Sequence, residues 1–141
     1  MTTITTVSRG DGSFEAEVGQ HRLVIDVPAS MGGSERGPTS VELFATSLGS
    51  CVAAFVAAYC TRVDLDATGL SVDVGYEVAE EPTRLVDLEV TINLPNADVG
   101  DRREAIRRVA EHCPVHETVE YTLEAIDLEV RDRSKLAAGT G

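Results

Sequence analysis

The residues of this sequence whose chemistry most needs explaining are its three cysteines, Cys51, Cys60 and Cys113. A cysteine thiolate is a nucleophile, and oxidation can carry it through a sulfenic acid to a disulfide. Residues 1–10 are polar and contain no hydrophobic signal region, so we expect a cytoplasmic protein. Static disulfides are rare in that reducing compartment. The cysteines are therefore either small buried apolar residues or redox-active groups.

Helix geometry limits which cysteines can pair. Cys51 and Cys60 are nine residues apart in one predicted helix, which puts them on opposite faces and about 13 Å apart along the axis. Since a disulfide needs Cα atoms within about 7 Å, these two cannot pair while the helix holds. Either Cys51 or Cys60 remains a possible partner of Cys113, and the spacing alone does not choose. The small residues of Leu48-Gly49-Ser50, which let a substrate or another backbone approach, favour Cys51.

A long apolar helix must position Cys51. Thr39 and Glu42 have the spacing of a capping box, and the sequence from Val41 to Tyr59 is apolar or small almost all round. A helix without a polar face has to be covered on every side. We expect a sheet to cover one side and a partner subunit the other. The most apolar run, Cys51–Cys60, is about half the length that spans a bilayer, so no membrane segment is expected.

The remaining pattern predicts strands and a second helix. Alternating apolar and polar residues with period two indicate half-buried strands at 14–18, 23–27, 71–78 and 87–94, the last two joined as a hairpin at 80–83. A final strand is predicted at 121–130 with a bulge between Ala125 and Ile126. We expect a single domain at residues 1–130, of α+β class with antiparallel sheet, and a mobile tail at 131–141.

The second helix is predicted from Asp101 to His112, with Asp101 and Glu104 resembling a capping box. Its i, i+4 series places Cys113 on the buried stripe, and Pro114 stops or bends the helix there. Four arginines on this helix lie among acidic residues, and we interpret them as a solvated face: Arg102, Arg103, Arg107 and Arg108.

Composition excludes several functions. The net charge of −12 argues against nucleic acid as a partner, because duplex binding needs clustered Lys and Arg. His112, Cys113 and His116 are close in sequence, but no C-x-x-C accompanies them, so no metal is expected. Gly32-Gly33 lacks the spacing of a dinucleotide or phosphate-binding loop, so no cofactor is expected.

Two motifs resemble those of a known family. The segment Gly37-Pro38-Thr39-Ser40-Val41-Glu42-Leu43, continuing to Leu48-Gly49-Ser50-Cys51, resembles the helix motif G-P-T/S-P-x-E-L, small residues and cysteine, of the OsmC/Ohr (osmotically induced / organic hydroperoxide resistance) family. His112-Cys113-Pro114-Val115-His116 resembles its second motif, C-P-V-H. The order of elements also matches from about residue 10 to about residue 130. The resemblance implies antiparallel sheets around a long central Cys-bearing helix, in an intertwined homodimer.

The resemblance also implies an activity in oxidative-stress defence. Cys51 would attack a peroxide as thiolate and become a sulfenic acid, and Cys113 would condense with it to a disulfide. An external dithiol reductant, lipoyl-type in well-studied members, would restore the pair. An apolar wall of Phe44, Leu48 and Phe55 favours organic hydroperoxides as substrates.

A cation has to activate Cys51, because burial among apolar groups raises the pKa of a thiol. In the family's peroxidases an arginine held by a glutamate does so, and that glutamate stands ten positions before the cysteine. This sequence has Val41 there, and its acid is Glu42, which also serves as the capping-box partner of Thr39.

The first candidate for the activating cation is Arg9, in Arg9-Gly10-Asp11-Gly12, where a G-R-D-G stretch occurs in Ohr-type members. Arg36, just before the long helix, is the second candidate, and Arg22 the third. The departure at Val41 favours an alternative function. In that alternative the same dimer is a non-catalytic small-molecule-binding or redox-sensing module.

Overall fold

The structure is a computed structural model of the chain, and it describes residues 1–121, 126 and 128–131. Its elements are antiparallel strands and helices, as the α+β prediction requires. Of the strand predicted at 121–130, with its bulge at 125–126, residues 122–125 and 127 lie outside the described residues, and the residues described there form no strand. The tail predicted at 131–141 lies outside them almost entirely.

The N-terminal sheet contains three antiparallel strands in sequential order: β1 (Thr5–Ser8), β2 (Phe14–Val18) and β3 (His21–Ile25). Phe14 pairs with Ile25 and Val18 with His21. The β2–β3 turn is tight because Gly19 adopts φ 61°, a conformation that glycine accepts without strain. The third strand therefore starts two residues earlier than its alternation predicted.

Helix α1 (Ser40–Arg62) begins at the predicted capping box. The Glu42 backbone N–H donates to Thr39 Oγ1 at 3.3 Å, and the Thr39 N–H donates to Glu42 Oε2 at 2.7 Å. These two bonds satisfy amide groups that the first turn of a helix leaves without partners. The helix then continues unbroken for 23 residues, starting directly after the predicted N-cap and ending beyond Tyr59, where the predicted apolar stretch ends.

A second sheet covers one side of α1. Its strands β4 (Ser71–Glu80) and β5 (Thr83–Asn93) form the predicted hairpin, with a register shift between Gly75 and Glu77. Side chains of this hairpin pack on a buried core that α1 dominates. That core consists of Leu48, Val52, Val56, Tyr59, Cys60, Ile106, Ala110 and Cys113.

The second helix differs from its prediction at both ends. A 3₁₀ turn, η2 (Gly100–Arg102), precedes α2 (Arg103–Glu111), and no side chain caps α2. The predicted capping box of Asp101 and Glu104 is therefore wrong, because Asp101 lies inside η2. At its other end the chain turns, as Pro114 predicted, and α3 (Pro114–Glu120) follows with Cys113 as its N-cap. A further 3₁₀ turn, η1 (Ala29–Met31), lies before α1.

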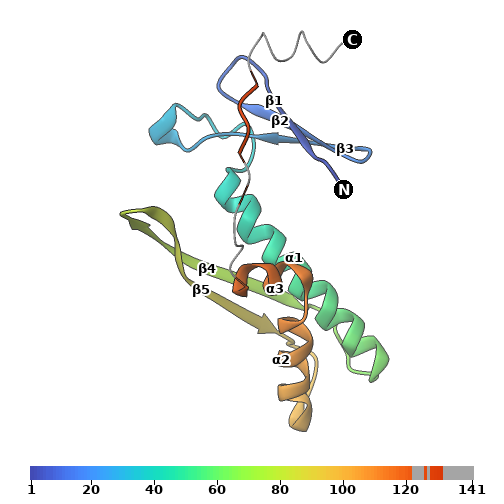
Figure 1. Ribbon diagram of the computed structural model, residues 1–141. Coiled ribbons are helices and arrows are strands. Elements are labelled where there is room, and N and C mark those ends of the chain that lie inside the picture. The colour runs from blue at the N-terminus through green and yellow to red at the C-terminus, as the bar shows by residue number, and fades with distance from the viewer. Residues whose placement is uncertain (122–125, 127, 132–141) are drawn as a thin grey trace.

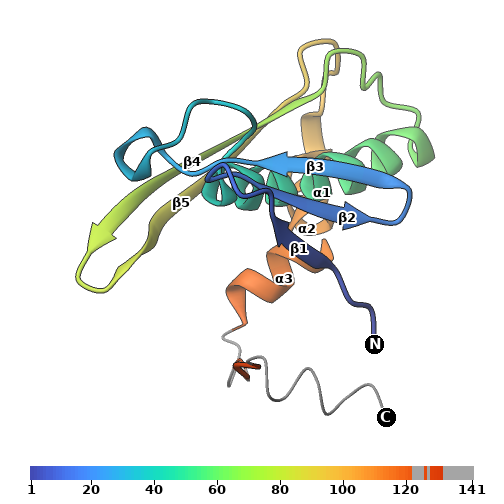
Figure 2. The ribbon, with the colours of Figure 1, turned by 90° about the horizontal axis from the view of Figure 1, so that it is seen from above.

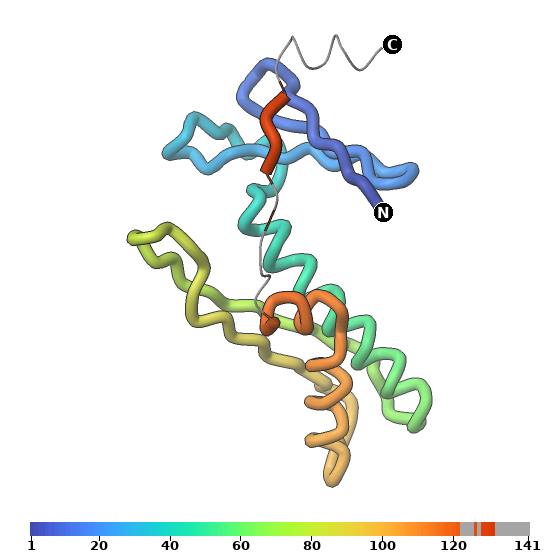
Figure 3. The backbone as a smooth tube through the Cα atoms, in the orientation of Figure 1, coloured from blue at the N-terminus to red at the C-terminus, as the bar shows by residue number. Residues whose placement is uncertain are grey.

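The N-terminal sheet stands apart from the rest of the molecule. Figures 1 and 3 show β1–β3 beyond the first turn of α1, away from α2. In Figure 2, seen from above, the sheet overlies α1 and α2 in projection. The core cluster, as far as the structure describes the chain, contains no residue of β1–β3. Large apolar side chains on these strands, Val7, Phe14 and Leu23, are exposed.

One side of α1 is also uncovered within a single chain. Val41, Phe44 and Phe55 are each 38% exposed. By length and composition alone, α1 passes as a membrane-spanning helix, with a mean hydropathy of 1.8 over 18 residues, of which 22% are buried. The run Cys51–Cys60, on which the expectation of no membrane segment rests, is only part of α1 and by itself is too short to span a bilayer. The central helix of a soluble protein passes the same test. The observation therefore shows that α1 needs to be covered, but not by what.

The capping box gives a direct test of what starts α1. We expect Thr39→Ala to lower the free energy of unfolding by about 1 kcal/mol, because the Glu42 N–H loses its acceptor. Thr39→Ser keeps that acceptor and is the matched control. Urea unfolding measures both, and equal stability of the two variants would contradict the assigned role.

Candidate active site

Cys51 lies in the middle of α1 and is half-buried. On the same helix Leu48 and Val52 are buried in the core, whereas Ser50 is exposed. Gly49 packs against β4, where an added Cβ would come within 3.1 Å of Val74 Cγ2. The small residues before Cys51 thus permit a close approach of the hairpin. The predicted apolar wall is only partly open, because Leu48 is 2% exposed.

Cys113 occupies the junction between α2 and α3 and is fully buried. It has extended backbone angles, φ −70° and ψ 141°, as an N-cap residue normally does. Its Sγ accepts a hydrogen bond from the backbone N–H of His116 at 3.3 Å. Pro114 at the first position of α3 fixes this geometry, since proline there loses no helical hydrogen bond.

The structure brings Cys51 and Cys113 together. Burial raises the pKa of the Cys113 thiol, and its interaction with Cys51 raises that pKa further, while the His116 N–H opposes the increase. Cys60 is also fully buried, and burial raises its pKa, but Cys113 is not among the groups that act on it. All three cysteines are free thiols. Of the two pairings that helix geometry left open, the structure therefore favours Cys51 with Cys113.

Arg36 is held in an ion-pair network at the start of α1. Its Nε lies 3.0 Å from Asp26 Oδ2, its Nη2 lies 3.2 Å from Asp26 Oδ1, and its Nη1 lies 3.1 Å from Asp11 Oδ2. Asp26 is 2% exposed and also accepts from the backbone N–H groups of Val27, Ser34 and Arg36. The Arg36 guanidinium, aided by these N–H groups, holds the pKa of Asp26 far below its ordinary value. Hydrogen bonds from Ser13 lower the pKa of Asp11 to about 2.

Arg9 and Glu42 are engaged locally. Arg9 Nη1 lies 3.4 Å from Ser13 Oγ in the β1–β2 turn, and Glu42 completes the capping box with Thr39. Because α1 is unbroken, Glu42 lies on the face opposite Cys51 and about 13 Å along the axis. Among the residues that the structure describes, no hydrogen bond or ion pair joins Arg9, Arg36 or Glu42 to Cys51.

The two histidines near Cys113 face glutamates rather than each other. His112 Nδ1 lies 3.0 Å from Glu117 Oε1, and His116 Nδ1 lies 3.7 Å from Glu120 Oε2. In the described part of the chain, no cluster of three or more His, Cys, Asp or Glu residues is arranged to hold a metal.

Sequence reasoning missed the buried Asp26. A signal was present in Gly33 and Gly37, which flank Arg36 and allow the loop to close on β3 and the residues after it. A Cβ on Gly37 would collide with the carbonyl of Val24, and one on Gly33 with that of Val27. A tightly folded Gly-rich loop has many backbone N–H groups to satisfy, and a buried carboxylate does so.

Comparison with known proteins identifies the family. The profile of the OsmC-like protein family matches residues 32–128. This chain belongs to the OsmC-like protein family. The match includes both cysteine motifs. No curated protein sequence is similar enough to match the chain.

Solved structures support the same fold. One is a Psychrobacter arcticus protein described as an osmotic stress induced and detoxification response protein (TM-score 0.75, 23% identity, 84% of this chain and 88% of that one). Another is an OsmC like protein from Mycoplasma pneumoniae (TM-score 0.67, 22% identity, 84% of this chain and 86% of that one). A third is the organic hydroperoxide resistance protein OhrB of Bacillus subtilis (TM-score 0.58, 17% identity, 83% of this chain and 88% of that one). At these identities the likeness concerns the fold.

The Asp26–Arg36 pair predicts how stability depends on pH. Because the folded-state pKa of Asp26 lies below its ordinary 3.8, the pair stabilises the fold above that pH and loses its effect as pH falls further. We expect Asp26→Asn to be less stable than the unsubstituted protein at pH 7, with a difference that shrinks below pH 3.8. Urea unfolding across that range measures it. The exposed Asp98→Asn is the control, and a difference independent of pH would refute the linkage.

Proposed function

We propose that this protein is a thiol-dependent peroxidase that reduces organic hydroperoxides in oxidative-stress defence. The observation that carries the proposal is that a partly exposed thiol, Cys51, lies against a fully buried one, Cys113. Membership of the OsmC-like family supports it, as do structural neighbours named organic hydroperoxide resistance proteins.

The proposed cycle has three steps. The Cys51 thiolate attacks one oxygen of the hydroperoxide, the O–O bond breaks, and the alkoxide leaves and takes a proton to become the alcohol. The resulting Cys51 sulfenic acid is attacked by the Cys113 sulfur, and the hydroxyl leaves with the Cys113 proton as water. A dithiol, lipoyl-type by family resemblance, then reduces the disulfide by exchange and is itself oxidised.

Burial assigns the two roles. The thiolate is the reactive form, and a substrate must reach it, which favours the partly exposed Cys51 as nucleophile. Cys113 is fully buried with a raised pKa, so it stays protonated and unreactive toward peroxide in solution. It becomes useful only when a sulfenic acid forms beside it. These are the properties that a resolving cysteine needs.

A homodimer would complete this site. The uncovered side of α1 and the exposed side chains of β1–β3 are two apolar surfaces that a second copy can bury in an intertwined arrangement. Arg9, Arg36 and Glu42 form no hydrogen bond with Cys51 within the described part of one chain. We infer that the activating cation comes from the N-terminal sheet or loop of the partner. The proposal places this dimer in the cytoplasm, where thiols stay reduced.

Among the described residues of one chain, no arginine forms a hydrogen bond with Cys51, and this favours one alternative. In it, the same dimer binds an apolar small molecule or senses oxidants, and Cys51 reacts no faster than a free cysteine. The choice between the two functions rests on the rate at which Cys51 reacts.

Cysteine variants test the peroxidase. We expect Cys51→Ser to reduce the consumption of cumene hydroperoxide to the uncatalysed rate, because the nucleophile is gone. Cys113→Ser should form a sulfenic acid on Cys51 in one turnover and then stop. Mass spectrometry of the oxidised protein should show a Cys51–Cys113 disulfide. Cys60→Ala is the matched control, a change at a buried thiol on the same helix that leaves turnover intact.

Two outcomes would contradict the proposal. Oxidation of Cys51 at the rate of free cysteine would support the binding or sensing dimer instead. A disulfide from Cys60 to Cys113 would reject the assigned pair while leaving peroxide chemistry possible.

The exposed side of α1 tests the dimer. Phe44→Asp and Phe55→Asp would each bury a charge without a partner at the interface. We expect the dimer to weaken by about 2 kcal/mol or more, roughly thirtyfold in dissociation constant. Thr61→Asp, exposed on the last turn of α1, is the control. Light scattering across a concentration series measures the mass, and a monomeric unsubstituted protein at micromolar concentration would refute the dimer.

A further inference from the structure

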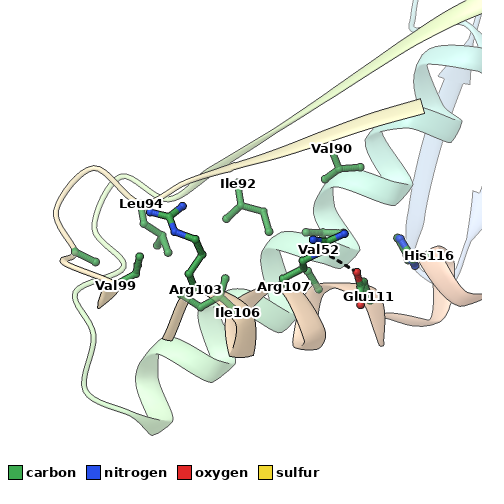
Figure 4. Close-up of a pocket in the computed structure, with 12 residues that line it drawn as sticks. Val52, Val90, Ile92, Leu94, Val99, Arg103, Ile106, Arg107, Glu111 and His116 are labelled. Atoms are coloured by element: carbon green, nitrogen blue, oxygen red, sulfur yellow. Dashed lines mark hydrogen bonds and ion pairs between the residues drawn. The ribbon is translucent and has the colours of Figure 1, made fainter. Parts of the chain in front are cut away.

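A cavity lies between β5 and α2 (Figure 4), and its lining includes Val52, next to Cys51 in sequence, and His116, whose backbone N–H binds Cys113 Sγ. Its volume is about 400 Å³, within the range of small-molecule sites. Val90, Ile92 and Leu94 of β5 form one wall, and Ile106 of α2 forms part of the other. Val52, on α1, is 1% exposed, so the cavity reaches the core. None of the three cysteines lines it.

Two of the four arginines interpreted as a solvated face lie at the edge of this cavity. They are Arg103 and Arg107, one helical turn apart on α2. Arg107 Nε lies 3.1 Å from Glu111 Oε1. Arg103 extends toward Leu94 in Figure 4, and in the described part of the chain it has no hydrogen bond or ion pair.

We propose that this cavity binds a single-chain alkyl carboxylate. The alkyl chain lies between β5 and α2, and the carboxylate lies at the edge, paired with Arg103 and Arg107. A guanidinium matches a carboxylate with two parallel hydrogen bonds, and Arg103 has its donors free for this among the described residues. The apolar walls require a chain without polar groups, and a narrow chain can enter between a strand and a helix.

Charge complementarity selects this ligand over others. An alkyl alcohol would fill the apolar walls but bring no counterion for Arg103, since among the described residues only Arg107 has an acidic partner, Glu111. An alkylammonium would place a like charge beside them. Because no cysteine sulfur lines the cavity, failure to bind the carboxylate and failure of Cys51 to react with peroxide are separate results.

Calorimetric titration of the full chain with sodium decanoate, below its micelle-forming concentration, tests the proposal. We expect saturable binding of decanoate, weaker binding of decanol and none of decyltrimethylammonium. Arg103→Gln and Arg107→Gln should each weaken decanoate binding about tenfold or more, because each removes a charged hydrogen-bond donor. Arg108→Gln is the matched control, with the same charge change on the same helix outside the cavity.

A cavity-filling variant tests the alkyl chain separately. Ala97 lies at the cavity wall in the loop after β5, and Ala97→Leu should weaken decanoate and decanol alike. Methyl resonances of Val99 and Ile106 should shift on titration, whereas signals of Phe44 and Phe55 on the outer side of α1 should not. Circular dichroism confirms that each variant folds.

Several results would overturn the proposal. Equal affinity for decanoate and decanol, or full affinity in Arg103→Gln and Arg107→Gln, would show that no carboxylate is recognised. Shifts confined to Phe44 and Phe55 would place the ligand on the other side of α1. Contacts from the cavity methyls to a second copy, or to residues 122–141, in ligand-free protein would show that protein already fills the cavity.

Discussion

The structure depends on one constraint, which is that α1 is apolar or small around almost its whole circumference. A helix of this kind buries its surface only if other elements cover every side. Within one chain, the β4–β5 hairpin covers part of it, and α2 with α3 covers another part (Figure 1). The side that carries Val41, Phe44 and Phe55 remains exposed. Every other element can be understood by what it contributes to that cover, including the N-terminal sheet, which covers little of α1 in its own chain.

The N-terminal sheet is tied to α1 by polar rather than apolar contacts. The Asp26 carboxylate, just after β3, gathers three backbone N–H groups and the Arg36 guanidinium, and the Asp26 N–H donates to the Pro38 carbonyl. A buried carboxylate is costly unless such partners surround it, and then its loop has essentially one conformation. The network therefore fixes the direction in which β1–β3 project. A fixed direction matters if the sheet is to cover a second copy.

Much of the architecture was predictable because it rests on local patterns. Alternation located β2 to β5, the Thr39–Glu42 spacing located the start of α1, and Pro114 located the break after α2. Local patterns did not predict the start of α2 or the burial of Asp26, because contacts between distant parts of the chain determine both. The pairing of Cys51 with Cys113 could not come from spacing, since the two are 62 residues apart and only packing of α3 on α1 brings them together. The cavity beside Arg103 was hidden for the same reason.

One chain leaves two features incomplete, the cover of α1 and the activation of Cys51, and a second copy could complete both. Cys51 lies on α1 between Phe44 and Phe55, two of the exposed apolar residues of that helix, so whatever covers them also excludes water from Cys51. Excluding water raises the pKa of a thiol unless a cation accompanies the cover. A second copy brings its N-terminal sheet and loop, with Arg9 and Arg36, as the covering surface. The apolar contact that we propose for assembly and the charge that we propose for activation would then arrive together, which makes reactivity of Cys51 a property of the dimer.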